Sequence, residues 1–356
     1  MLSYVYRASI LYFTPPCSRS SRFQRDRALA LRRHSLGTCM RDETQDAKTR
    51  QQQDTNALLE VAELHDAAGL ASRFRTVDLP WISTCGGAVP SFEAAHITPE
   101  ALHEQFVLHN RPAVLRALQD WRPLSHWNDA HIRALCGERT ISVRLVDEAR
   151  QFGDPKRQGM YTHASLSLDS FIDALEAAEA RGQPAPYYAA QLSLRRDLPE
   201  LFADTRPEPP HLHALGALWR GSPHLYIGGS SQTPLHFDAF DNLLCVVRGR
   251  KTLLLWHPGC AELLYPGGGG SALFSQADVF APDLEAFPLL ERALLLALHV
   301  DLGPGDALYL PCGWWHAVQS QPPAQGHQRS ISLSYWARQS GGKVRDSSEG
   351  GAAFHV

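Results

Sequence analysis

The second half of the chain alternates short apolar segments with turns that contain glycine or proline. Such segments follow one another from the proline cluster Pro207, Pro209 and Pro210 to Tyr335 and Trp336. Short apolar runs bounded by turn residues are typical of the strands of a β-sandwich or barrel, whereas a βαβ fold alternates strands with long helices. The pattern therefore predicts a mainly β fold in this half.

Helical patterns come earlier. Residues 97–118 predict a capped helix followed by a strand, because Thr98 can accept a capping hydrogen bond and Pro99 suits the first helical turn. The segment 284–298 also predicts a helix, although its sequence LLLALHV is equally compatible with entry into a strand. We further expect helices at 131–136 and 166–181, and strands at 140–146 and in PAPYYAAQLSL.

Residues 232–256 predict two β-strands joined by a tight turn. The first strand carries His236 and Asp238, which share one face of an extended strand and could bind one metal ion. This pair is a weak signal by itself, because the chain holds a second such tripeptide, His299-Val-Asp301. We interpret the second tripeptide as structural, since His299 closes an apolar run and Asp301 opens a turn.

A metal site on this hairpin needs a third ligand from another strand. His316 follows the turn GPGD and the strand ALYLP, and is well placed to supply that ligand. Two histidines and one carboxylate form the facial triad of non-haem Fe(II) oxygenases, which leaves coordination positions open. Lys251, on the returning strand, adds a basic residue to the same region. Together with His236 and Asp238, these residues predict an oxygenase centre.

Three segments resemble the JmjC (cupin-like) Fe(II)- and 2-oxoglutarate-dependent oxygenases: TPLHFDAFDNLLCVVRGRKTLLLW, LGPGDALYLPCGWWHAV and SISLSYW. The resemblance is to the small hydroxylase branch, which includes the hypoxia-inducible-factor asparaginyl hydroxylase, a JmjC lysyl hydroxylase and the tRNA wybutosine hydroxylase. It covers about residues 90–338 and implies a double-stranded β-helix (jelly-roll, cupin-like) barrel with flanking helices. It also implies that His236, Asp238 and His316 are iron ligands.

The resemblance implies a set of co-substrate contacts as well. Lys251 is expected to pair with the distal carboxylate of 2-oxoglutarate, assisted by the hydroxyls of Thr233 and Tyr188. Asn242, which we place on the same strand as the ligands, is a further contact, and Tyr187 is the alternative to Tyr188. A buried unpaired charge is very unfavourable, so a lysine that faces the barrel interior needs such an anion.

Two neighbouring positions refine this expectation. Arg248 and Arg250 flank Gly249 at the turn and are interpreted as solvated, which leaves Lys251 as the inward-facing base of the hairpin. Ser334 stands where the asparaginyl hydroxylase has a polar amide in its last barrel strand, so that contact is expected to differ here.

The implied reaction hydroxylates a side chain of a partner protein, with succinate and CO2 as co-products. Two alternatives stay open, a tRNA-base (wybutosine-type) hydroxylase and a non-catalytic metal-binding cupin scaffold. Binding of RNA requires a basic patch. Its candidate members are Arg195, Arg196, Arg220, Arg248 and Arg250.

Composition limits these possibilities only in part. The 356 residues carry a formal net charge of −3, and 44% are hydrophobic, which indicates a globular chain without an overall electrostatic preference for nucleic acid or membranes. The seven cysteines are scattered without a CxxC pair, so we expect a reducing compartment and no disulfide framework or cysteine zinc site. No run approaches the roughly 18 apolar residues of a membrane span.

We divide the chain into four parts. Residues 1–54 form an arginine- and serine-rich leader and linker, which is either an organellar transit peptide, a disordered leader or the result of a wrongly assigned start codon. Residues 55–89 predict a short helix and linker, 90–338 the oxygenase domain, and 339–356 a disordered tail without the helical dimerisation extension of some relatives. The expected location is intracellular, in the cytoplasm or nucleus, or in a mitochondrion or plastid if the leader directs import.

Overall fold

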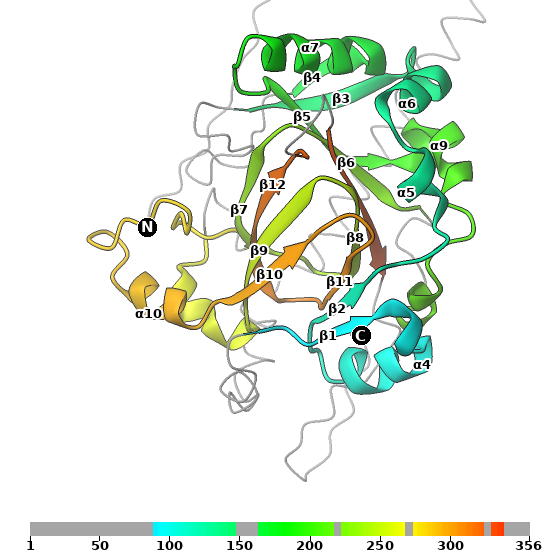
Figure 1. Cartoon of the computed structure of the whole chain (residues 1–356). Helices are drawn as coiled ribbons and strands as arrows, with labels where there is room; N and C mark the ends of the chain where they lie inside the picture. Colours follow the sequence, from blue (N-terminus) through cyan, green and yellow to red (C-terminus); the bar gives the residue numbers. More distant parts are fainter. Residues whose placement is uncertain (1–87, 147–162, 217–221, 268–272, 324–328, 338–356) are drawn as a thin grey trace, which may run out of the picture. The chain divides into compact units, whose positions relative to one another are not determined.

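The computed structural model describes residues 88–146, 163–216, 222–267, 273–323 and 329–337. The described strands form two sheets that face each other. Most of the helices lie on the outer side of the larger sheet, whereas α10 packs against the smaller sheet (Figure 1). The leader, the helix expected within residues 55–89 and the tail all lie outside the described residues. This mainly β architecture is the jelly-roll barrel that the sequence predicts.

The larger sheet contains nine strands in the order β1-β2-β11-β8-β13-β6-β5-β3-β4, and the smaller contains four in the order β10-β9-β12-β7. The pairing of β1 with β2 is parallel, and the other ladders of the described strands are antiparallel. The strands are β1 Ser91–Glu93, β2 Ala113–Arg116, β3 Thr140–Leu145, β4 His163–Ser167, β5 Tyr187–Ser193, β6 His224–Gly228, β7 Ser231–Phe237, β8 Asp241–Arg248, β9 Arg250–Trp256, β10 Leu298–Leu302, β11 Ala307–Leu310, β12 Trp315–Gln321 and β13 Ser330–Ala337.

Most of the helices are short, and polar side chains cap the first turn of several of them. Thr98 Oγ1 accepts a hydrogen bond from the Ala101 amide, as expected, and Asn128 caps α6 in the same way. The α-helices are α4 Pro99–Leu102, α5 Arg122–His126, α6 Asp129–Cys136, α7 Leu168–Ala180, α8 Leu194–Asp197, α9 Pro199–Asp204 and α10 Leu289–Leu295. The 3-10 helices are η1 Ala94–His96, η3 Pro210–Ala214 and η5 Pro258–Leu264, and η2 His103–Val107 is a π-helix.

Strand β8 shows how the core is divided. Its residues Leu243, Cys245 and Val247 pack under the helices, whereas Leu244 and Val246 face the smaller sheet. Because alternate side chains of a strand point to opposite faces, a strand buried on both faces is apolar throughout. The space between the two sheets is therefore lined by the residues of β8 that alternate with those under the helices. Polar side chains in this otherwise apolar space are candidates for a functional site.

The structure corrects three sequence expectations. Residues 232–256 contain three strands (β7, β8 and β9) rather than two, because a separate turn divides β7 from β8. The helix expected at 166–181 begins only at Leu168, after the strand β4, since Ser167 caps it by accepting a hydrogen bond from the Ser170 amide at 3.1 Å. The segment 284–298 ends its helix at Leu295, and its last residue enters strand β10.

The second His-x-Asp tripeptide lies on β10, which pairs with β9. His299 is exposed, and Asp301 Oδ1 accepts a hydrogen bond from Thr252 Oγ1 at 2.7 Å. Asp301 also forms an ion pair with Arg250 at 3.2 Å. The structural interpretation of this tripeptide is therefore confirmed, although Asp301 lies inside the strand and not at the turn.

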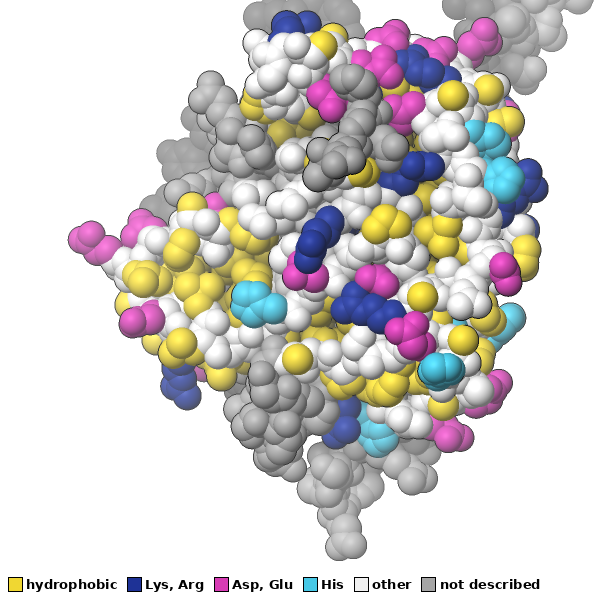
Figure 2. Space-filling view, viewed as in Figure 1, with side chains coloured by type: hydrophobic (Ala, Val, Ile, Leu, Met, Phe, Trp, Pro, Cys, Tyr) yellow, Lys and Arg dark blue, Asp and Glu magenta, His cyan; other side chains and the backbone are white. Residues whose placement is uncertain are grey.

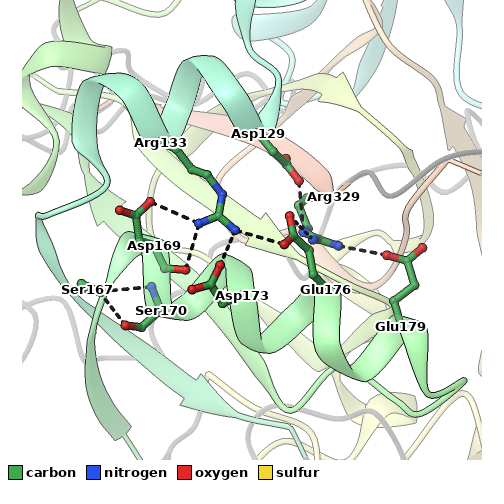
Figure 3. A network of polar contacts seen from close by, with 9 residues as sticks. All are labelled: Asp129, Arg133, Ser167, Asp169, Ser170, Asp173, Glu176, Glu179 and Arg329. Carbon is green, nitrogen blue, oxygen red and sulfur yellow. Dashed lines mark hydrogen bonds and ion pairs between the residues drawn. The ribbon is translucent and has the colours of Figure 1, made fainter.

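A network of ion pairs around the buried Arg329 joins helices α6 and α7 to the start of β13 (Figure 3). The side chain of Arg329 is 3% exposed and contacts Asp129 from α6 at 3.5 Å. It also contacts Glu176 and Glu179 from α7 at 3.6 and 3.3 Å. Through these ion pairs, Arg329 links both helices to β13, the strand that carries Ser332 and Ser334.

The described cysteines are Cys136, Cys245, Cys260 and Cys312, and each is buried with a free thiol. This agrees with the expectation of a chain without a disulfide framework, as far as the described residues extend. Among the described helices, none has the length and apolar character that a membrane span requires.

Candidate functional site

The structure brings His236, Asp238 and His316 together between the two sheets. His236 lies near the end of β7 and Asp238 directly follows that strand, while His316 lies on the adjacent strand β12 in register with His236. One potential ligand atom from each residue lies within 4.8 Å of the others. Asp238 Oδ1 is 3.8 Å from His236 Nε2, and Asp238 Oδ2 is 3.9 Å from His316 Nε2.

Backbone carbonyls fix which nitrogen each histidine offers. His236 Nδ1 lies 2.9 Å from the Pro234 carbonyl oxygen, and His316 Nδ1 lies 3.0 Å from that of Trp314. A carbonyl oxygen can only accept, so both Nδ1 atoms are the protonated donors and both Nε2 atoms keep a free lone pair. The two Nε2 atoms facing Asp238 therefore have the orientation that metal ligands need.

The surroundings keep His316 neutral. Burial lowers the pKa of His316 to about 4, and His236 contributes in the same direction, while Asp238 opposes the shift. The ring of His236 is stacked on Phe274 with the centroids 5.3 Å apart. Neutral imidazoles and a carboxylate suit a first-row divalent metal, so the donor set fits the iron that the resemblance implies.

Lys251 lies between the sheets, on β9, and only 4% of it is exposed. Its Nζ donates to Ser320 Oγ at 2.7 Å and to Tyr188 Oη at 3.4 Å, and it lies 5.8 Å from the centroid of the Tyr226 ring. Within the described residues Lys251 has no carboxylate partner. A buried ammonium group without a counter-ion is unfavourable, so this position fits a bound carboxylate.

Several polar atoms of the same interior have no hydrogen-bond partner among the described residues. Ser231 Oγ is one, and the pairing of β7, β12 and β9 places Ser231 opposite Ser320, which is opposite Lys251. Ser332 Oγ and Asn242 Oδ1 are two more. Buried polar groups are normally satisfied, so this set indicates that a polar ligand belongs between the sheets. The residues present therefore fit 2-oxoglutarate.

The structure distinguishes between the two candidate tyrosines. Tyr188 is 1% exposed and points toward Lys251, whereas Tyr187 packs on the opposite face against the core under the helices. Thr233 lies on β7, in register with Val318 and three residues before His236. The structure therefore places Tyr188, rather than Tyr187, beside the lysine.

The expectation for Asn242 needs correction. It lies on β8 in the larger sheet, not on β7, the strand of the smaller sheet that carries His236. Its Nδ2 donates to Ser334 Oγ at 3.3 Å, and both residues are buried. Ser334, which stands where the asparaginyl hydroxylase has an amide side chain, thus accepts a hydrogen bond from Asn242 on the neighbouring strand.

Sequence reasoning missed two residues of this interior. Ser320 lies four residues after His316, so the strand period of two could have found it. Tyr226 lies on β6 and is partly buried, with its ring centroid 6.4 Å from that of Trp336. No sequence motif includes Tyr226. Its strand β6 belongs to the larger sheet and comes near β9 and its Lys251 only because the two sheets face each other.

The arginines expected for RNA binding are largely engaged in other contacts. Arg196 pairs with Asp197 at 2.7 Å, Arg250 pairs with Asp301, and Arg248 Nε donates to the Trp127 carbonyl. Arg220 lies outside the described residues. On the face shown in Figure 2, dark blue Lys and Arg side chains alternate with acidic ones and form no continuous basic surface.

Comparison with known proteins agrees with the barrel fold described above. Residues 99–342, more than half of the chain, match the model of a family described as cupin-like domain. The human bifunctional peptidase and (3S)-lysyl hydroxylase JMJD7 is 29% identical over 267 residues, which are 67% of this chain and 81% of that protein.

Two further relatives are longer proteins. HSPB1-associated protein 1 from Bos taurus is 29% identical over 70% of this chain and 53% of its own length. Lysine-specific demethylase JMJ31 from Arabidopsis thaliana is 32% identical over 70% of this chain and 49% of its own. The match therefore spans about half the length of these two relatives.

Proposed function

We propose that this chain, which belongs to the cupin-like domain family and is an oxygenase of the JmjC type, hydroxylates a protein side chain with Fe(II) and 2-oxoglutarate. One observation carries the proposal. The His236, Asp238 and His316 cluster lies in the same interior as Lys251, a buried cation that has no carboxylate partner among the described residues.

His236 and His316 would hold the metal through Nε2, and Asp238 through its carboxylate. The carbonyls of Pro234 and Trp314 orient the two rings before the metal binds, which reduces the rearrangement that binding requires. When bound, Fe(II) together with 2-oxoglutarate supplies the oxidising power to hydroxylate an unactivated C–H bond, with succinate and CO2 as co-products.

Lys251 would pair with the distal carboxylate of 2-oxoglutarate. The hydroxyls of Ser320 and Tyr188 hold the ammonium group in place, and Thr233 and Asn242 would complete the polar lining. The apolar layer between the sheets, including Leu253 and Leu255, excludes water around this ion pair and so strengthens it.

A protein substrate is favoured by the relatives. JMJD7 is named as a lysyl hydroxylase and JMJ31 as a lysine-specific demethylase, and both names describe action on protein side chains. A tRNA substrate has less support, because Arg196 and Arg250 are neutralised by acidic partners. Retention on tRNA that weakens steeply with salt would reverse this preference.

The test begins with anaerobic binding of Fe(II) and 2-oxoglutarate, followed by succinate release in air. At a free metal concentration about 100-fold above Kd, we expect the metal to stabilise the protein by about 2.7 kcal/mol. Asp238→Ala is expected to abolish both this stabilisation and succinate release. The matched control is Asp301→Ala, which removes the aspartate of the other His-x-Asp tripeptide and is expected to retain both.

Mass spectrometry of proteins from cells with wild-type or Asp238→Ala enzyme would then identify the substrate by the gain of one oxygen atom. Purified wild-type protein that binds neither Fe(II) nor 2-oxoglutarate would refute the oxygenase proposal.

A further inference from the structure

Two connections of the chain cross from one sheet to the other at the same end of the barrel. Residues 238–240 lead from β7 to β8, and residues 311–314 lead from β11 to β12. Strand β7 pairs with β12 in the smaller sheet, and β8 pairs with β11 in the larger one. The two connections therefore lie side by side. Asp238 belongs to the first, and His316 follows shortly after the second.

Two hydrogen bonds join these connections. The Gly313 amide donates to the Asp238 carbonyl oxygen at 2.9 Å, and the Cys312 amide donates to Asp241 Oδ1 at 2.9 Å. The first bond joins two backbone groups, whereas the second depends on the side chain of Asp241, the first residue of β8. Cys312 and Asp241 are both buried, with 9% and 1% of their surfaces exposed. A buried amide needs an acceptor, and Asp241 supplies it here.

Asp241 is not part of the candidate metal cluster. It lies three residues after Asp238 in the sequence, but the potential ligand atoms that come together among the described residues belong to His236, Asp238 and His316. A carboxylate is costly to bury unless it is hydrogen-bonded. The position of Asp241 is therefore explained by what its oxygens accept, and one of them accepts from the turn that precedes His316.

This turn fixes the ring of His316. Trp314 is its last residue, and the Trp314 amide donates to the Pro311 carbonyl oxygen at 3.3 Å. The Trp314 carbonyl oxygen in turn accepts the hydrogen bond from His316 Nδ1 at 3.0 Å. A displacement of the turn would therefore move the acceptor that orients His316. It would also move His316 Nε2 relative to Asp238 Oδ2, which lies 3.9 Å away.

We propose that Asp241 is a positioning residue of the metal centre. Its Oδ1 holds the turn 311–314 against the connection that carries Asp238, and this contact keeps Asp238 and His316 at the spacing that one metal ion requires. The inference rests on the proposed function and adds a residue to that site. Residues that orient metal ligands contribute to affinity because the ligands are then in place before the metal binds.

Two substitutions of Asp241 test whether the acceptor oxygen matters. Asp241→Asn keeps an oxygen that can accept from the Cys312 amide, whereas Asp241→Leu has a similar size and no acceptor. We expect Asp241→Leu to bind Mn(II) about tenfold more weakly than the wild type, the lower end of the range for residues that orient metal ligands. Asp241→Asn is expected to restore most of that loss.

The donor can be removed independently by Cys312→Pro. Residues 311–314 form a hydrogen-bonded turn in which Gly313, the third residue, has a φ of +80°, whereas Cys312 has no positive φ. This is a type II turn, which commonly has proline at its second position. Proline deletes the amide that donates to Asp241, so we expect the same loss of affinity as for Asp241→Leu. Cys312→Ala keeps the amide and is the matched control.

The double variant Asp241→Leu/Cys312→Pro separates positioning from stability. In Asp241→Leu the Cys312 amide is buried without this acceptor, and removing both partners of a hydrogen bond relieves that penalty. We therefore expect the double variant to resist urea better than Asp241→Leu. Its affinity for Mn(II) should nevertheless stay about tenfold below that of the wild type, because the contact is still missing. Affinity that recovers together with stability would make Asp241 a purely structural residue and overturn the inference.

The measurement is a titration of each full-length protein with Mn(II) alone, in which the electron paramagnetic resonance signal counts the free metal. Asp204→Ala is the control for loss of a buried aspartate elsewhere, since Asp204 is 5% exposed and accepts from Trp127 Nε1 at 3.2 Å. It is expected to lower the stability in urea and to leave the affinity for Mn(II) unchanged.

Wild-type affinity in both Asp241→Leu and Cys312→Pro would overturn the inference, as would equal losses in Asp241→Asn and Asp241→Leu. If Asp241→Leu does not fold, the comparison of Cys312→Pro with Cys312→Ala decides alone. A wild-type protein that binds no Mn(II) refutes both the proposed oxygenase and this inference. Binding by the wild type combined with either of the first two results refutes only the role of Asp241.

Discussion

Lys251 and Ser320 are direct cross-strand neighbours on β9 and β12, and Lys251 Nζ donates to Ser320 Oγ at 2.7 Å. Both residues are buried, with 4% and 2% of their surfaces exposed. The serine thus holds the end of a flexible side chain at one point between the sheets. This relationship gives the first of four predictions.

Ser320→Ala removes the hydroxyl while leaving the charge of Lys251 in place. Hydrogen bonds to charged groups contribute about 1.5–3 kcal/mol, so we expect the affinity for 2-oxoglutarate to fall at least about tenfold. Titration calorimetry with Mn(II) in place of iron measures this change. Ser125→Ala is the control, since Ser125 is exposed on α5. Equal loss in both variants would contradict a specific role for Ser320.

Lys251→Met tests the charge itself. Methionine retains the apolar stem, but the distal carboxylate of 2-oxoglutarate would lose the cation that we propose pairs with it. Removal of one partner of a buried charge pair costs about 2–5 kcal/mol, so we expect affinity to fall on the order of 100-fold. Metal binding should persist, because Lys251 contacts none of the three candidate ligands.

Arg250→Met is the matched control for this variant. Arg250 is the preceding residue, but its side chain is exposed and pairs with Asp301. The same calorimetric titration is expected to show wild-type affinity. If Lys251→Met retained full affinity for 2-oxoglutarate, the lysine would not be the carboxylate partner.

His257 should make the stability of the metal-free protein depend on pH. Burial lowers its pKa to about 4, and its Nδ1 accepts a hydrogen bond from the Gly259 amide at 3.0 Å. Between pH 4 and the ordinary histidine value of about 6.5, the unfolded chain binds a proton here that the folded chain does not. The unfolding free energy therefore falls as the pH drops through this range.

The variant His257→Asn separates the contribution of His257 to this pH dependence from those of other titrating groups. The asparagine oxygen can still accept from the Gly259 amide, but it does not titrate. We expect the pH dependence between about 6.5 and 4 to flatten by up to about 1.4 kcal/mol per pH unit, the value for one proton. Urea unfolding across this range measures the slope, and an identical slope in both proteins would contradict the prediction.

Arg329→Met should destabilise the fold without touching the site. It leaves Asp129, Glu176 and Glu179 without their shared cation, and Asp129 is the most buried of the three acids. Because the two glutamates are partly exposed, we expect a loss of about 2–3 kcal/mol, below the range for fully buried pairs.

Arg133→Met is the comparison for this network. The side chain of Arg133 is 26% exposed, so its loss is expected to reduce the unfolding free energy by no more than about 1 kcal/mol. Burial raises the pKa of Asp129, so acidification should protonate it and reduce the effect of Arg329→Met. Urea unfolding at neutral and acidic pH tests both statements.

The predictable part of this protein follows from local rules. A strand period of two placed His236 and Asp238 on one face, and the same period marks His316 and Ser320. Thr98 could be identified as a helix cap because capping involves only the next few residues. The family motifs extended this to Lys251, since motif and spacing together are more specific than either residue type alone.

The structure decided what depends on pairing between distant segments. Tyr188 and Tyr187 are equivalent in sequence, and only the packing of β5 against β6 turns Tyr188 toward Lys251. The prediction places Asn242 on the wrong strand because no glycine or proline marks the turn between β7 and β8. Its bond with Ser334 depends on a partner 92 residues away.

The sequence by itself therefore determined the strand-rich fold, the residue types of the candidate metal ligands and the position of the cationic Lys251 on the returning strand. These properties follow from the alternation of apolar and polar side chains and from the residue types themselves. The tertiary structure alone decided that Ser320 accepts a hydrogen bond from Lys251 and that Asn242 donates one to Ser334. Cross-strand register is set by the summed packing of both sheets, and a local pattern of residues carries no information about which distant strand lies opposite.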